Sequence, residues 1–190
     1  MFARHTNSAN AVTNCVHANN STDIIDFSGS EASIFLSTIL GINLTKLTAS
    51  GFGLRGTLDD ELYSEHSFCV YYFSETAFRF VLPHKASLQL QSLINEQQLR
   101  FDIDYVNRTD LTSFTLSGEN AFETLVNAFK LTPGLRLSDS LLCYGAQSGD
   151  VFVTAIDKKE EQHFVLIAKT AELQKWQSYM QDKGFALIQK

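Results

Sequence analysis

Apolar residues in the first hundred positions follow two spacings, and each spacing predicts a different kind of element. Residues 23–27, DIIDF, form a short β-branched run that predicts a strand. From Ala32 to Leu40 the apolar side chains recur every three or four residues, which predicts a helix with one apolar stripe. Ser28 is expected to cap this helix, and Glu31, three positions on, completes a capping box.

The middle of the chain is predicted to continue with a hairpin, a helix and a strand. The runs SFCVYYF (67–73) and AFRFVL (77–82) are joined by the short turn SET, as in a β-hairpin. A helix is expected over about 84–97, because its apolar residues share one side. In RFDIDYV (100–106) apolar and acidic residues alternate, which predicts a strand with one face in water.

The remaining sequence repeats this order of elements. Ser28 and Gly29 recur as Ser117 and Gly118, again before an apolar helix. The predicted second set is a strand at 111–116, a helix capped by Ser117, strands at 140–146, 150–156 and 163–169, a helix over 171–183 closed by Gly184, and a last strand at 185–190.

Two such sets of elements predict an α+β fold made of two repeats of the βαββ(β)αβ type. Each repeat should place its helices on one face of a mostly antiparallel sheet, and the two sheets should pack together to cover their other faces. We expect a loose N-terminal arm at 1–21, a first half at 22–108 and a second half at 109–190. Val12, Cys15 and Val16 are apolar residues that could fix part of this arm.

Composition excludes several classes of function. The formal net charge is −6, from 15 Lys and Arg against 21 Asp and Glu, and no basic stripe is present, so a nucleic-acid surface is not expected. No apolar run approaches the ~20 residues of a membrane span, and no signal peptide is evident. The 3 cysteines and 5 histidines are scattered without ligand spacing, so no metal site is expected. A cytoplasmic globular protein is predicted.

An ordered set of motifs resembles one known family. In the first half these residues are Gly29, Ala32, Phe35-Leu36, Asn43-Leu44, Lys46-Leu47 and Gly51. With the hairpin VYYFSETAFRFVLP and the later segments LSGENA and GDVFVTA, they resemble the folate-binding aminomethyltransferase family. That family includes the glycine cleavage T-protein and the gamma subunit of heterotetrameric sarcosine oxidase. The likeness runs from about Ile24 to the end of the sequence.

The resemblance implies that the reactive acid of the family is missing. It places Ser67 where the family has an aspartate beside the folate, and serine offers no negative charge to a developing cation. The polar asparagine that the family has after the next strand falls on Pro83. Residues 59–61 are acidic but lie upstream in a segment that we expect to be solvated. Enzymatic activity is therefore uncertain, and no catalytic residue is assigned.

Two residues fall on positions that contact folate in the family. Tyr71 matches a tyrosine that lines the pocket, although a half-buried strand tyrosine with a satisfied hydroxyl also explains it. Glu160 aligns with a glutamate that binds the pterin, although it also reads as a charge at a hairpin tip. The implied cofactor is tetrahydrofolate.

Three functions are left open by the sequence. The first is a non-catalytic, gamma-type subunit that binds larger subunits of a sarcosine oxidase-like complex, or itself. The second is a minimal tetrahydrofolate-binding protein with a residual role in aminomethyl or formaldehyde transfer. The third is a stand-alone interaction domain.

Overall fold

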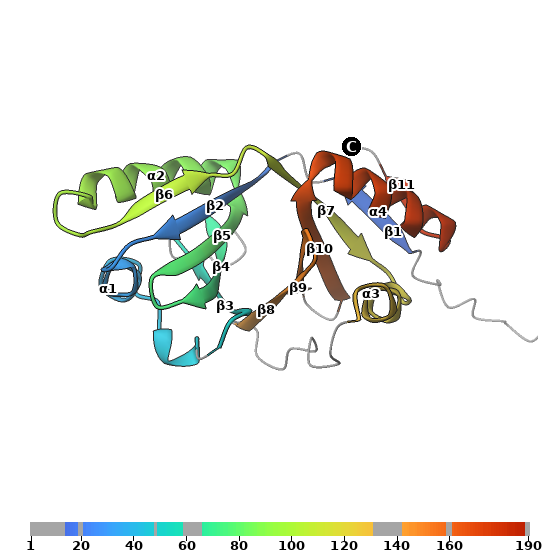
Figure 1. Cartoon of the computed structure of the whole chain (residues 1–190), viewed down its shortest axis with the longest axis horizontal. Coiled ribbons are helices and arrows are strands. Elements are labelled where there is room, and N and C mark those ends of the chain that lie inside the picture. Colours follow the sequence, from blue (N-terminus) through green and yellow to red (C-terminus); the bar gives the residue numbers. More distant parts are fainter. Residues whose placement is uncertain are drawn as a thin grey trace, which may run out of the picture.

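In the part of the chain that the structure describes, a single curled β-sheet of eleven strands forms the framework, and four α-helices pack on its outer surface (Figure 1). The computed structural model describes residues 14–18, 21–47, 49–58, 66–130, 142–158 and 161–188 of the 190-residue chain. No helix in these ranges is long and apolar enough to cross a lipid bilayer.

The helices and strands have the following bounds. The strands are β1 (Cys15–Ala18), β2 (Thr22–Ser28), β3 (Phe52–Thr57), β4 (Ser67–Ser74), β5 (Ala77–Pro83), β6 (Asp104–Asn107), β7 (Leu111–Ser117), β8 (Leu142–Ser148), β9 (Val151–Lys158), β10 (Glu161–Lys169) and β11 (Ala186–Ile188). The helices are α1 (Ala32–Thr38), the 3₁₀ turn η1 (Leu44–Lys46), α2 (His84–Gln97), α3 (Ala121–Phe129) and α4 (Thr170–Asp182). The predicted hairpin, the helix over 84–97 and the helix near 171–183 are therefore confirmed.

The strand order in the sheet is β11-β1-β7-β10-β9-β8-β3-β4-β5-β2-β6. We call β2 to β6 the first half of the sheet, and β7 to β11 together with β1 the second half. The described strand pairs are antiparallel except β1 with β11, as the predicted mostly antiparallel arrangement requires.

The sequence predicted two separate sheets, and on this point the structure differs. The two halves are joined edge to edge by β3 and β8, with Gly53 opposite Cys143 and Phe52 opposite Tyr144. An isolated half would leave the backbone groups of these two edge strands exposed, and their pairing satisfies them within the protein.

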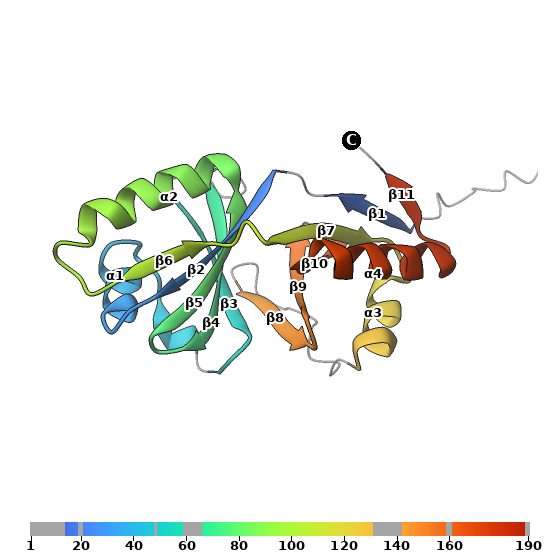
Figure 2. The ribbon, with the colours of Figure 1, turned by 45° about the horizontal axis from the view of Figure 1, so that its top comes forward.

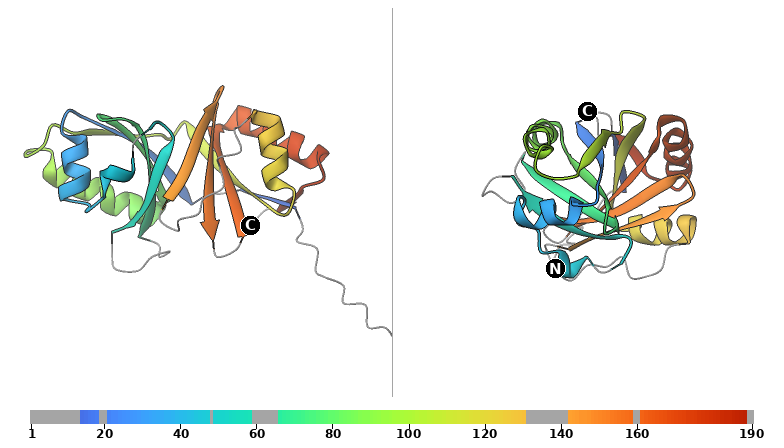
Figure 3. Two further views of the ribbon diagram at one scale, coloured as in Figure 1. Left: turned by 90° about the horizontal axis from the view of Figure 1, so that it is seen from below. Right: turned by 60° about the vertical axis from the view of Figure 1, so that its left-hand side comes forward.

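Side chains alternate along the strands between an outer and an inner face. On the outer faces, α1 and α2 cover the first half and α3 and α4 cover the second, so helices stand at both sides with strands between them (Figure 3). Phe27, Phe35 and Phe80 are buried in the first outer core, and Phe164 and Leu125 are buried in the second. Each helix thus buries its apolar stripe against one half of the sheet.

The inner faces of the two halves share a third, smaller core, which we call the inner layer. It consists of eight buried residues: Ile24, Cys69, Tyr71, Val81, Cys143, Phe152, Val165 and Ile167. These residues come from β2, β4 and β5 on one side and from β8, β9 and β10 on the other. The expected covering of the inner sheet faces by each other is therefore present.

Part of the predicted N-terminal arm is a strand. β1 lies between β7 and β11, beside elements from the far end of the chain (Figure 2). Cys15 and Val16 are buried there, and Val16 belongs to the second outer core. The sequence did not predict this strand because four residues are too few to show a period. Residues 1–13 lie outside the described ranges.

The predicted serine caps are wrong at both helices. Ser28 and Ser117 are the last residues of β2 and β7, and the helices begin a few residues later, after Glu31 and Asn120. Neither Glu31 nor Asn120 makes a side-chain capping bond. The carboxylate of Glu31 instead accepts the backbone N–H of Asp102 at 2.7 Å, which ties the start of α1 to the segment before β6. The backbone N–H of Glu31 in turn donates to the carbonyl oxygen of Asp102 at 3.2 Å, so a tertiary hydrogen bond satisfies this N–H at the helix start.

Candidate functional site

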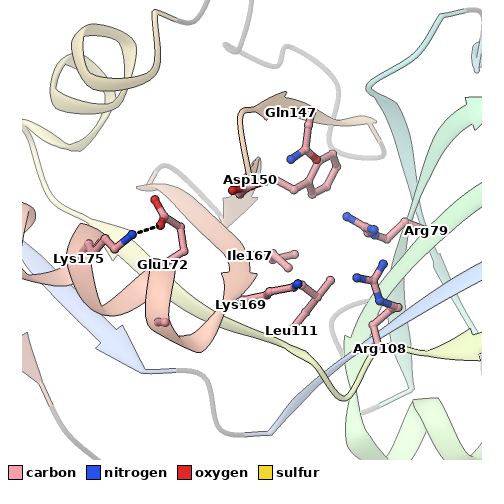
Figure 4. A pocket seen from close by; sticks show the side chains of 11 residues that line it. Arg79, Arg108, Leu111, Gln147, Asp150, Ile167, Lys169, Glu172 and Lys175 are labelled. Carbon is pink, nitrogen blue, oxygen red and sulfur yellow. Dashed lines mark hydrogen bonds and ion pairs between the residues drawn. The ribbon is translucent and has the colours of Figure 1, made fainter.

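A pocket lies where the inner faces of the two halves diverge, and it encloses about 370 Å³ (Figure 4). Basic side chains from both halves line it: Arg79 of β5, Arg108 after β6, Lys169 at the end of β10 and Lys175 of α4. The volume is in the range of small-molecule sites in proteins.

An ion-pair network fixes the wall formed by the first half. Asp26 and Arg79 are directly opposite each other in the β2–β5 pair, so both side chains project from the inner face. Arg79 donates from Nε to Asp26 Oδ1 at 2.7 Å and from Nη2 to Asp26 Oδ2 at 3.1 Å. Arg108 donates from Nη1 to the same carboxylate, and from Nε and Nη2 to Asp110 at 2.8 and 2.9 Å. Asp26 therefore holds two arginines at one side of the pocket.

The network lowers the pKa of both carboxylates. Burial alone would raise the pKa of Asp26, but hydrogen bonds and charges from Arg79 and Arg108 outweigh it, and its pKa is below the ordinary value. Hydrogen bonds from Arg108 hold the pKa of exposed Asp110 at about 2. The same bonds from Asp110 and Asp26 raise the pKa of Arg108. Both acids remain ionised at neutral pH.

Acid is expected to release the stabilisation that Asp26 provides. Its pKa is lower in the folded than in the unfolded chain, so the contribution is complete above about pH 4 and is lost as the pH falls toward the folded pKa. We expect Asp26→Asn to lower the free energy of unfolding by about 2 kcal/mol at pH 6. Urea titrations between pH 6 and 2 should show this difference shrinking with falling pH. Asp182→Asn, at the exposed end of α4, is the control, and equal behaviour of the two variants would contradict the assignment.

Apolar side chains form the floor of the pocket. Phe152, Leu111 and Ile167 line it, and the Phe152 ring is almost fully buried. The guanidinium carbon of Arg79 lies 5.4 Å from the ring centres of both Phe73 and Phe152. These distances allow cation–π attraction, which adds to the ion pair in holding Arg79 in place.

The wall formed by the second half carries charges of both signs. Lys175 Nζ donates to Glu172 Oε2 at 2.8 Å, and the Trp176 indole donates to Glu172 Oε1 at 3.2 Å. Hydrogen bonding to Lys175 lowers the pKa of Glu172. Asp150 lines the same wall, and its charge contributes to the raised pKa of Lys175.

The structure places Tyr71 under the pocket rather than on its surface. Tyr71 is fully buried in β4, where the sequence suggested a half-buried residue, and it is not among the lining residues. Its ring meets Phe152 edge-on, with 5.2 Å between centroids and 82° between planes. Burial, with the nearby thiols of Cys143 and Cys69, raises the pKa of its hydroxyl well above the ordinary value. Contact between Tyr71 and a ligand stays a prediction.

Three buried hydroxyl groups of the described residues lie between the halves. Tyr71 Oη, Ser113 Oγ and Thr154 Oγ1 are buried, and none has a hydrogen-bond partner of standard geometry within the described ranges. Thr154 nevertheless lies close enough to Tyr71 to affect its pKa. Buried hydroxyls in proteins are normally paired, so these three are available to water or to a ligand that enters between the halves.

Of the other residues from the resemblance, the structure describes Ser67, which lies away from the pocket. Ser67 begins β4, half-buried and opposite Thr57 of β3. Glu160 lies outside the described residues, and so do the acidic residues 59–61. Ser67 is not among the residues that line the pocket.

The residues that form the pocket were missed from the sequence, although a signal was present. Asp26 and Arg79 are charges inside otherwise apolar strands, DIIDF and AFRFVL, where a charged residue is buried only if it is paired. Matching the negative charge of Asp26 with the positive charge of Arg79 would have indicated the ion-pair network. Arg108 and Lys169 carry no such signal because both lie at element ends.

Comparison with solved structures identifies the architecture. An aminomethyltransferase T of the glycine cleavage system from Bartonella henselae superposes with a TM-score of 0.73 over 94% of this chain, at 15% sequence identity. The chain has the aminomethyltransferase-like fold. It spans 48% of the length of the Bartonella protein, and no protein-family model matches the sequence.

A second solved structure with this fold comes from a different enzyme. A chain of the heterotetrameric sarcosine oxidase from Corynebacterium sp. U-96, solved with pyrrole 2-carboxylate, superposes with a TM-score of 0.59 at 12% identity. The alignment covers 85% of this chain and 78% of that chain. At these identities the likeness establishes the fold alone.

Proposed function

We propose that this protein is a non-catalytic, gamma-type subunit of a sarcosine oxidase-like complex of one-carbon metabolism, located in the cytoplasm. The observation that carries the proposal is that carboxylates at the pocket serve as ion-pair partners. Three of them, Asp26, Asp110 and Glu172, are each committed to an ion pair with an arginine or a lysine, and Asp150 also lines the pocket. The fold shared with a sarcosine oxidase chain supports the assignment.

The chemistry of these carboxylates disfavours catalysis. A general acid or base works best with a pKa near the operating pH, and the pKa values of Asp26, Asp110 and Glu172 are all lowered from their ordinary values. Such carboxylates hold protons too weakly to donate them and accept them too poorly to act as a base. At Ser67, where the resemblance expects an aspartate, no charge is available to stabilise a cationic intermediate.

We also propose that the two halves arose from one repeated unit. The order β3-β4-β5-β2 in the first half matches β8-β9-β10-β7 in the second, and both sets place one helix after the first strand and one before the last. Gly29 and Gly118 both have a positive φ at the same turn. The boundary near residue 108 falls between β6 and β7.

Reconstitution tests the subunit role. The purified chain, mixed with the larger subunits of a sarcosine oxidase from the same organism, is expected to comigrate with them in analytical ultracentrifugation. The chain alone is expected to show no transfer of a one-carbon unit to tetrahydrofolate. Ser67→Ala should leave both results unchanged, since Ser67 has no catalytic part in this proposal. Turnover by the isolated chain that depends on Ser67, or failure to assemble, would overturn it.

Tetrahydrofolate binding is the second candidate, and the three unpaired hydroxyls between the halves favour it. A pterin could use Tyr71 Oη, Thr154 Oγ1 and Ser113 Oγ as hydrogen-bonding partners, provided that Phe152 moves to admit it. The melting temperature of the protein should then rise by a few degrees when tetrahydrofolate is added. Tyr71→Phe, which keeps the ring and removes the hydroxyl, should reduce this rise. No shift at millimolar tetrahydrofolate would exclude this function.

A further inference from the structure

We propose that the pocket between the halves binds a small organic carboxylate, with Arg79 as the anchoring residue. This site goes beyond the subunit role and does not depend on it. It also differs from the position implied by the family resemblance, since Ser67, which begins β4, is not among the residues that line the pocket.

The guanidinium of Arg79 is fixed in position, and one of its edges has no hydrogen-bond partner among the described residues. Its side chain is 12% exposed, and its Nε–Nη2 edge faces Asp26. Phe73 and Phe152 flank the guanidinium, which restricts its rotation. No hydrogen bond joins Nη1 to a residue of the described ranges, and the guanidinium points toward the cavity (Figure 4). An arginine fixed in this way can present its remaining N–H groups to a carboxylate at little cost in side-chain entropy.

Further positive charge gathers on the same side. Arg108 and Lys169 line the cavity beside Arg79, and the three cationic groups come from both halves. Asp26 and Asp110 face the arginines from behind and are not lining residues. Lys169 makes no hydrogen bond to a described residue, and Asp110 is the acid whose pKa its charge affects. Because Asp26 and Asp110 already offset the charges of the two arginines, a bound anion would interact with the N–H groups of Arg79 that Asp26 leaves free and with the charge of Lys169.

The apolar floor selects the body of the ligand, while the far wall carries Asp150 and the Glu172–Lys175 ion pair. Leu111, Phe152 and Ile167 provide an apolar floor next to the cations. A fully hydrated inorganic anion gains nothing from such a floor, whereas a carboxylate with an aromatic or aliphatic body buries apolar surface on it. The combination of a fixed guanidinium, two further cations and an apolar floor therefore favours an organic carboxylate over phosphate.

Titration of the full chain with benzoate tests the site. Amide chemical shifts in ¹H–¹⁵N spectra should change at Phe152, Ile167 and Lys169 with saturation in the millimolar range. Arg79→Gln should weaken binding at least about 10-fold. Arg100 is exposed, and among the described residues its side chain bonds to Gln97 alone, so Arg100→Gln should leave binding unchanged. Benzamide, the neutral counterpart of benzoate, should bind at least about 10-fold more weakly.

Three results would overturn the proposal. The first is that no amide chemical shift changes at the pocket up to roughly 50 mM benzoate. The second is that benzamide binds as tightly as benzoate, and the third is that phosphate does. If Arg79→Gln fails to give a folded spectrum, Lys169→Gln replaces it, because the side chain of Lys169 is exposed and its replacement should leave the fold intact. A loss of benzoate affinity of about 3-fold is expected for that variant, and no loss would count against the site.

Discussion

Replacing Phe152 with alanine is expected to lower the free energy of unfolding by about 3–5 kcal/mol. The side chain is 1% exposed and belongs to the inner layer, where it meets Tyr71 and Phe73 with ring centroids 5.2 and 5.7 Å away. Its ring also lies over Gly145, so that a Cβ at that glycine would be 2.2 Å from Phe152 Cζ. Removing the ring opens a cavity between the two halves that neither can fill without moving.

Urea denaturation at neutral pH measures this effect. Leu99→Ala removes a large apolar side chain that is 97% exposed, and it should change stability by less than about 0.5 kcal/mol. Phe152→Leu keeps most of the volume and should cost about 1.5 kcal/mol. A loss below about 1 kcal/mol for the alanine variant would mean that the halves do not share this core in solution.

Gly29→Ala is expected to destabilise the protein by about 3 kcal/mol or more, because it combines two separate costs. Gly29 has a φ of 144°, a conformation that residues with a Cβ rarely adopt. An added Cβ would also stand 2.1 Å from the backbone oxygen of Asp102 and 2.7 Å from Cα of Ile103. Since both contacts are to backbone atoms, relief requires the segment before β6 to move away from α1.

Gly41→Ala separates these two costs. Gly41 also has a positive φ, 64°, but a Cβ built there meets nothing within 4 Å. It should therefore show the conformational cost alone, about 1 kcal/mol. Thermal and urea unfolding of the two variants should differ by about 2 kcal/mol or more, and equal losses would contradict the close approach of Asp102 to Gly29.

Much of the local structure could be predicted because it is determined by nearby residues. The periodic apolar positions of α2 and the alternation across β4 and β5 come from a few consecutive side chains, and both were predicted close to their observed bounds. The caps at Ser28 and Ser117 failed for the opposite reason. The N–H and carboxylate groups at the start of α1 bond to Asp102, which lies far along the chain and has no sequence signature.

The candidate site was predictable only in small part. Tyr71 was placed on the correct strand, but whether its ring would face solvent or be buried depends on Phe152, from the other half. Arg79, Arg108 and Lys169 come from three separate segments and gather only after the sheet has curled. The charges inside apolar strands indicated that a pairing partner was needed, without indicating which one.

The sequence by itself determined the elements and their layering, since the spacing of apolar side chains decides which face of a helix or strand must be buried. Only the tertiary structure decided three further features: the insertion of β1 between β7 and β11, the joining of the halves through β3 and β8, and the pocket between them. Each depends on contacts between residues far apart in the chain. These contacts depend on which strand edges and sheet faces meet in the folded chain. Their meeting produces no periodic pattern in the sequence, so the sequence alone does not predict it.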